Sequence, residues 1–213
     1  MRVALRGALE WRRAPRSFEG LANVAIHSVC VFCASSNEVP RIYVDAAAHL
    51  GHCLAARGIT LVYGGGNNGL MGVLAQAVHK SGGHVIGVIP LALQELELAY
   101  VDADELIVTR DLRERKATME ARSDAYIALP GGYGTLEEIL ETVTLRQLRF
   151  HEKPVAFLNT AGFYEPLVEF FMHMIEQGFA KATSTSLFHL APTPEEALDY
   201  LGSYEPQPGK YVP

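Results

Sequence analysis

The chain has 213 residues, of which 49% are hydrophobic, and a formal net charge of −6. This is enough apolar sequence for one sizeable core, so residues 26–213 are expected to form a single domain. Because no basic stripe runs along the sequence, binding to the phosphate backbone of nucleic acid has little electrostatic support. No run of about 18 apolar residues is present, so no membrane-spanning segment or membrane partner is expected.

Residues 1–25 are expected to be a loosely ordered extension in front of this domain. Five arginines fall within the first sixteen residues, where acidic residues are scarce. Such an arm is also typical of a targeting segment, which is the alternative, but it lacks the continuous apolar stretch of a secretory signal.

The cysteines and histidines predict neither a disulfide framework nor a metal site. The cysteines are odd in number, and Cys30 and Cys33 lie in one apolar run, where residues three apart point to opposite faces of a strand. Core packing is therefore the favoured role of Cys30 and Cys33. The unpaired cysteine count also predicts a reducing, cytoplasmic compartment. The eight histidines are scattered, with His49 and His52 the one close pair, and no H-E-x-x-H motif is present, so no zinc site is expected.

Short apolar runs alternate with helix-period segments from residue 28 onward. The runs lack polar alternation, which is typical of strands buried on both faces, and lie at 28–34, 59–63, 84–89, 105–108, 125–129 and 154–158. Residues 43–56, 70–80 and 111–124 have the pattern of intervening helices. This order predicts an α/β fold, a doubly wound, Rossmann-like parallel sheet flanked by helices. A run at 187–190 and a helix start at Pro194 predict an edge strand and a closing helix.

Ligands of such sheets bind outside the carboxyl ends of the strands, where two glycine-rich loops are predicted. The first, GGGNNG at 64–69, satisfies G-x-G-x-x-G between a strand and a helix. The following strand ends without the acidic residue that holds a ribose in dinucleotide sites. We predict a phosphate or ribose contact at Gly65 and Gly66, with a merely tight strand-to-helix turn as the alternative.

The second loop, LPGGYGTLEE at 129–138, places glycines directly before a helix with paired glutamates. Thr135 and Glu138 have the T-x-x-E spacing of a capping box, which would turn the carboxylate back to its own helix. Alternatively, the carboxylate lies beside an anion held by the loop amides. A helical projection puts Leu136, Ile139, Leu140, Val143 and Gln147 on one face and Glu138 almost opposite.

Basic residues precede the fifth strand in the segment DLRERKATMEARSD at 111–124. A solvated charged helix face would explain them. However, the loop before this helix lies at the carboxyl end of a strand, so Arg115 and Lys116 are in position to reach an anion at the glycine loop.

With GGGNNGLMG, ERKATM and PGGYGTLEE in this order, the chain resembles the Lonely Guy family of cytokinin riboside 5′-monophosphate phosphoribohydrolases, often labelled lysine decarboxylases. The resemblance runs from about Ser28 to Leu201. It implies a doubly wound fold, a homodimer or larger homo-oligomer with sites near the subunit interface, and no cofactor. It also implies hydrolysis of the N-glycosidic bond of an adenine-type nucleoside 5′-monophosphate.

Carried over position by position, the resemblance implies that Arg115 and Glu138 are catalytic and that residues 132–135 bind the phosphate. Arg113 stands where the family often has histidine, which bears on substrate preference. With the glycine loops read from the sequence, the predicted substrate-binding residues are Gly65, Gly66, Glu97, Lys116, Gly131, Gly132, Tyr133, Gly134, Thr135, Glu137 and Thr144.

Two rival functions follow from the same residues. A nucleotide-binding carrier or sensor of this fold needs the glycine loops but has no use for a paired arginine and glutamate. A pyridoxal-phosphate decarboxylase needs a Schiff-base lysine, and none of the five lysines has a convincing setting for one.

Overall fold

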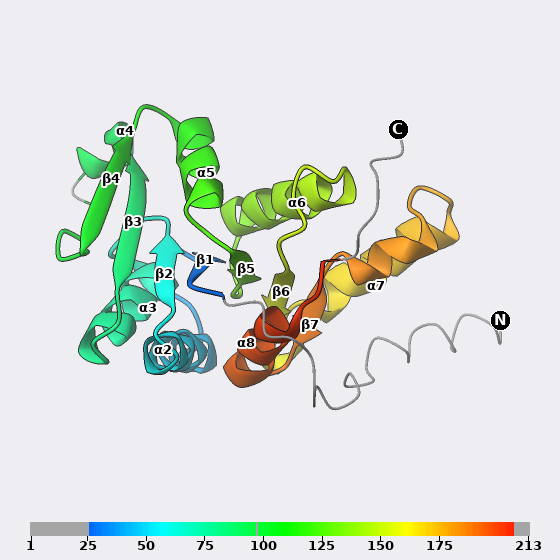
Figure 1. Cartoon of the computed structure of the whole chain (residues 1–213), viewed down its shortest axis with the longest axis horizontal. Coiled ribbons are helices and arrows are strands. Elements are labelled where there is room, and N and C mark those ends of the chain that lie inside the picture. The colour runs from blue at the N-terminus through cyan, green and yellow to red at the C-terminus, as the bar shows by residue number, and fades with distance from the viewer. Residues whose placement is uncertain (1–25, 97, 207–213) are drawn as a thin grey trace.

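The computed structural model describes residues 26–96 and 98–206 and contains a seven-stranded, all-parallel sheet with helices on both faces (Figure 1). The spatial order of the strands is β4-β3-β2-β1-β5-β6-β7. The doubly wound α/β prediction is confirmed, whereas the predicted extension at 1–25 lies outside the described residues. The strands are β1 (Ser28–Phe32), β2 (Thr60–Tyr63), β3 (Val85–Pro90), β4 (Glu105–Thr109), β5 (Ala125–Ala128), β6 (Val155–Leu158) and β7 (His189–Ala191).

The helices divide between the two faces of the sheet. One face is covered by α2 (Arg41–Ala56), α3 (Gly69–Lys80) and α8 (Pro194–Ser203), and the other by α5 (Leu112–Ala121), α6 (Tyr133–Gln147) and α7 (Glu165–Glu176) (Figure 1). A short α4 (Leu91–Gln94) follows β3, and 3₁₀ turns lie at Thr160–Gly162 and Ala182–Ser186. In the described part of the chain, every helix is too short or too polar to cross a bilayer.

The continuous apolar strands are explained by two separate cores. Val29 and Val31 belong to the core under α2, α3 and α8, whereas Cys30 and Phe32 belong to the core under α5 and α6. Cys33 joins the first core, so Cys30 and Cys33 lie on opposite faces, as their spacing predicts. Burial raises the pKa of both thiols, which keeps them protonated and favours packing over metal or redox chemistry.

The strand order reverses between β1 and β5, and this is where an α/β sheet opens a crevice for a ligand. The two strands are in register, with Val29 opposite Ala125 and Phe32 opposite Ala128. Beyond them, the amide of Leu129 still donates to the carbonyl of Phe32 at 2.9 Å. The loops that follow β1 and β5 therefore leave the sheet at the same level.

A buried histidine joins the end of α6 to the sheet. His151 is 9% exposed, and its Nε2 lies 3.1 Å from the carbonyl oxygen of Thr142, while its Nδ1 accepts a hydrogen bond from the amide of Lys153. These contacts fit a neutral ring with the proton on Nε2. Burial lowers the pKa of His151 to about 4, because a charged ring would lose its hydration there.

We expect His151 to make the fold less stable in mild acid. The unfolded chain binds a proton near pH 6.5 and the folded chain only near pH 4, so the free energy of unfolding falls as the pH drops through this window. Linkage gives a loss of about 1–2 kcal/mol between pH 7 and pH 5. Urea unfolding of His151→Gln should show a flatter pH dependence by this amount, and an unchanged slope would contradict a neutral buried ring.

Candidate active site

A nearly buried arginine lies at the carboxyl edge of the sheet. Asp111 caps α5 by accepting hydrogen bonds from the amides of Arg113 and Glu114, both at 2.9 Å, which starts the helix where the sequence predicts. Arg115 follows in the first turn and is 8% exposed. Its Nε donates to the carbonyl of Val88 in β3 at 2.9 Å, so the guanidinium is fixed to the sheet.

The guanidinium of Arg115 occupies space that a glycine in the loop after β2 leaves free. A Cβ atom at Gly64 would lie 2.0 Å from Nη2 of Arg115, which is closer than non-bonded atoms approach. Only a residue without a side chain leaves room for the guanidinium there. The first glycine loop therefore has a definite packing role beside Arg115.

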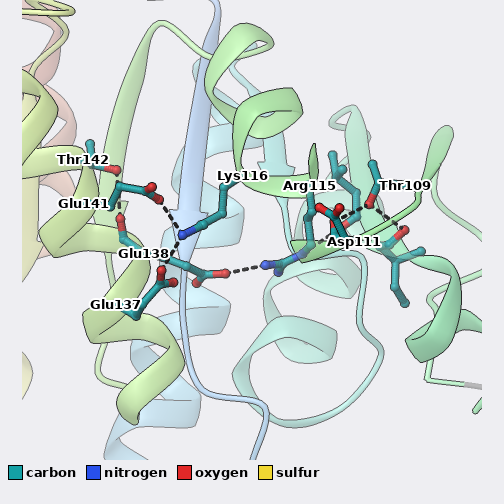
Figure 2. A network of polar contacts seen from close by, with 10 residues as sticks. Thr109, Asp111, Arg115, Lys116, Glu137, Glu138, Glu141 and Thr142 are labelled. Atoms are coloured by element: carbon teal, nitrogen blue, oxygen red, sulfur yellow. Dashed lines mark hydrogen bonds and ion pairs between the residues drawn. The ribbon is translucent and has the colours of Figure 1, made fainter. Parts of the chain in front are cut away.

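The carboxylate of Glu138 faces Arg115 and accepts a hydrogen bond from its Nη1 (Figure 2). Both side chains are largely withdrawn from water, with 10% of Arg115 and 13% of Glu138 exposed. The capping-box alternative is wrong, because α6 begins at Tyr133 with Gly132 at the N-cap position and Thr135 is already inside the first turn. Glu138 therefore points across to α5 and not back to its own helix.

The helical projection of α6 was only partly correct. The buried positions of the helix are Thr135, Ile139, Thr142 and Arg146, whereas Gln147 is exposed. Glu138 is next to this buried stripe, three residues after its first member, and not opposite the buried face. Its carboxylate consequently lies at the edge of the core, where it meets Arg115.

The N-terminus of α6 has no side-chain cap. Gly132 takes the N-cap position, and no described side chain accepts a hydrogen bond from the first-turn amides there. A Cβ at Gly131 would lie 2.1 Å from Oγ1 of Thr135, whereas Gly132 and Gly134 border open space. Tyr133 is 94% exposed beside them. Glu138 lies one helical turn from these amides.

Lys116 forms a second ion-pair group on the outer side of this contact (Figure 2). Its Nζ donates to Glu137, and to the carboxylate of Glu141 at 2.6 Å. Burial lowers the pKa of Lys116, but these two carboxylates outweigh it and raise the pKa above its ordinary value. Lys116 and Glu137, predicted from the sequence as ligand contacts, therefore lie together and next to the Arg115–Glu138 pair.

The loop at 64–69 already uses amides that an anion would need. The amide of Gly69 donates to the side chain of Asn37 at 2.7 Å, and that of Leu70 donates to the carbonyl of Ala34 at 2.9 Å. Residues 64–66 are themselves buried. This arrangement favours the tight-turn interpretation of the loop.

The remaining residues of the sequence prediction stay untested as ligand contacts. Gly65 and Gly66 are buried, and nucleotide contacts there stay a prediction. Thr144 lies six residues after Glu138, which is about 9 Å along the helix and on a different face. Glu97 lies outside the described residues.

Comparison with known proteins identifies the family. Residues 71–201 match the family model described as "Possible lysine decarboxylase". A protein of Oryza sativa subsp. japonica named probable cytokinin riboside 5′-monophosphate phosphoribohydrolase is 50% identical over 184 residues, 86% of this chain and 75% of that protein. A cytokinin riboside 5′-monophosphate phosphoribohydrolase of Arabidopsis thaliana is 46% identical over 188 residues, 88% of this chain and 87% of that protein. The chain belongs to this phosphoribohydrolase family.

Solved structures support the fold of this phosphoribohydrolase family member. The molybdenum cofactor binding protein of Rippkaea orientalis is 23% identical, with a TM-score of 0.61 over 83% of this chain and 95% of that protein. At this identity the likeness shows the fold alone. The description as a decarboxylase finds no support in the lysine next to the site, because Lys116 is held by two carboxylates.

Gly64→Ala should destabilise the chain by about 1–3 kcal/mol, since the new methyl group displaces the buried guanidinium of Arg115. Gly134→Ala is the matched control, because its Cβ meets open space in a helix and should leave stability unchanged or raise it by up to about 1 kcal/mol. Urea unfolding measures both. Equal stability of the two variants would show that Gly64 does not make room for Arg115.

Proposed function

We propose that the chain hydrolyses the N-glycosidic bond of adenine-type nucleoside 5′-monophosphates, namely cytokinin riboside 5′-monophosphates and AMP. The products are the free base and ribose 5-phosphate. The observation that carries this proposal is the Arg115–Glu138 pair, one helical turn from the N-terminus of α6. The names of the relatives agree with it.

The phosphate would bind at the start of α6. Open amides and the positive end of the helix dipole favour a dianion there. Gly132 and Gly134 leave the space that a phosphate needs, since a Cβ at either would contact nothing within 4 Å. Binding energy from this remote group then holds the sugar in a fixed position relative to Glu138.

Glu138 would act on the sugar. Cleavage of the C–N bond develops positive charge on the ribose, and a carboxylate in a site with little water stabilises that charge strongly. The same carboxylate orients a water molecule and takes its proton as the water attacks the anomeric carbon. The C–N bond breaks with its electron pair on the base, which takes up a proton from the solvent and leaves as the free base. Its 13% exposure leaves one edge open to a ligand.

Arg115 would position this carboxylate. Its guanidinium is held at Nε by the carbonyl of Val88 and donates through Nη1 to Glu138, so the carboxylate cannot rotate freely. A carrier or sensor has no need of a buried charge pair at the phosphate site, because burying charge is costly when no chemistry uses it. The pair therefore favours an enzyme over a carrier.

We expect Glu138→Gln to abolish hydrolysis while keeping nucleotide binding. The amide oxygen still accepts from Arg115, but the negative charge and the base are lost, which should reduce kcat by about 10²–10⁴-fold. Chromatography of free adenine released from AMP measures the rate, and calorimetry measures AMP binding.

Glu205→Gln is the control for this experiment, because the same chemical change falls at an exposed residue beyond α8. It should keep wild-type kcat. If Glu138→Gln hydrolyses AMP as fast as Glu205→Gln does, Glu138 is not the base. If the wild-type chain binds AMP and releases no adenine, the carrier function replaces the enzyme.

A parallel assay with isopentenyladenosine monophosphate compares the rate of hydrolysis of a prenylated substrate with that of plain AMP.

We further propose that the chain is a homo-oligomer whose copies meet along α6 and α7. A groove of about 410 Å³ runs between these helices and is lined mainly by apolar side chains, including Leu140, Val143 and Ile175. Phe179 next to it is 84% exposed. Thr144 lines the same groove, so a predicted ligand contact that is remote from Glu138 within one chain would lie at the interface.

Phe179→Glu should shift the chain toward the monomer, because a charge in the interface is not solvated. Light scattering after size exclusion should give a multiple of 23.3 kDa for the wild type and for the control Val101→Glu, another exposed apolar position at 78% exposure. A wild-type monomer, or equal masses for wild type and Phe179→Glu, would contradict this interface.

A further inference from the structure

A cluster of metal-binding side chains lies on the other face of the sheet from Arg115 and Glu138. His49 and Cys53 are one helical turn apart on α2, and Glu195 is in the first turn of α8. Nε2 of His49 lies 2.7 Å from Oε1 of Glu195, and Sγ of Cys53 lies 3.5 Å from the same oxygen. Among residues 26–96 and 98–206, this is the one group of at least three His, Cys, Asp or Glu ligand atoms within 4.8 Å of one another.

The separations suit a small tetrahedral ion. Zinc bonds of about 2.0–2.1 Å to nitrogen, 2.3 Å to sulfur and 2.0–2.2 Å to oxygen put tetrahedral ligand atoms about 3.3–3.7 Å apart. The sulfur–oxygen distance of 3.5 Å already has this value, and the nitrogen–oxygen distance of 2.7 Å has to widen. The two side chains concerned are about half exposed, 53% for His49 and 47% for Glu195, so a small rotation suffices.

We propose that His49, Cys53 and Glu195 bind one zinc ion, with water as the fourth ligand, and that this ion ties α2 to α8. A mixed nitrogen, sulfur and oxygen set favours zinc over magnesium or calcium, which prefer oxygen ligands alone. Histidine spacing along the sequence predicts no zinc site. It cannot reveal this one, because Glu195 is 142 residues from Cys53 in the sequence.

The neighbouring residues explain why these three side chains, and not their close relatives, form the site. His52, the other member of the histidine pair, has its Nδ1 2.7 Å from the hydroxyl of Ser81. Cys30 and Cys33 are buried in the sheet, whereas Cys53 is partly accessible. Burial and the carboxylate of Glu195 raise the pKa of Cys53 to about 11, so zinc has to displace the thiol proton to the solvent when it binds.

The site is independent of the proposed hydrolysis. α2 and α8 pack against the core on one face of the sheet. The helices that carry Arg115 and Glu138, α5 and α6, pack against the core on the other face. Zinc is therefore expected to raise thermal stability by binding the folded chain, and to leave the chemistry at Glu138 to the protein itself.

Calorimetric titration of the full chain with zinc chloride tests the proposal, using protein purified without a polyhistidine tag and freed of metal by chelator. One zinc per chain is expected. Because changes around a metal site cost about 10–100-fold in affinity even outside the direct ligands, Cys53→Ala, His49→Ala and Glu195→Gln should each weaken binding at least about tenfold. His52→Ala is the matched control on the same helix and should bind zinc as the wild type does, and magnesium chloride should give no binding.

Cobalt supplies a second readout that does not depend on affinity. The wild-type chain with one equivalent of cobalt should show a thiolate-to-metal charge-transfer band, which Cys53→Ala should lack while its melting temperature without metal stays close to that of the wild type. The proposal is overturned if the wild-type chain binds no zinc, if Cys53→Ala binds it equally well, or if His52→Ala loses it to the same extent.

Discussion

The arrangement of the whole site depends on one buried guanidinium that is satisfied at both ends. Arg115 donates to the carbonyl of Val88 on one side and to Glu138 on the other, and Gly64 leaves the space that it occupies. A charge this far from water is tolerated only when its partners are fixed, because losing either would leave an unpaired buried ion. The capped start of α5 and the close turn after β2 both support this contact.

The sheet brings together elements that are distant along the chain. The strand order reverses between β1 and β5, the place where sheets of this kind bind ligands, and α6 follows β5 with Gly132 at an N-cap position that no described side chain caps. In the proposed function, one helical turn separates two negative charges: the phosphate of the substrate at the start of α6 and the carboxylate of Glu138 on the side of the helix. Remote binding at the first can then position the sugar for chemistry at the second.

The fold could be predicted from the sequence because continuous apolar runs and their order determine it, whereas the joint role of Arg115 and Glu138 was implied by the family resemblance. The strands begin and end within about two residues of the predicted limits. The capping-box interpretation failed because T-x-x-E spacing also occurs inside a first turn, once a glycine takes the N-cap position. Contacts between distant segments have no signature in local spacing, which is why Gly64 beside Arg115 and Glu195 beside Cys53 emerge only from the three-dimensional structure.

The most direct test of the central claim is a crystal structure of Glu138→Gln with AMP bound. The account predicts phosphate oxygens within about 3 Å of the backbone amides of residues 133–135, and the anomeric carbon facing the side chain of residue 138 at about 4 Å or less. A phosphate held elsewhere, with the sugar turned away from Arg115 and residue 138, would contradict it.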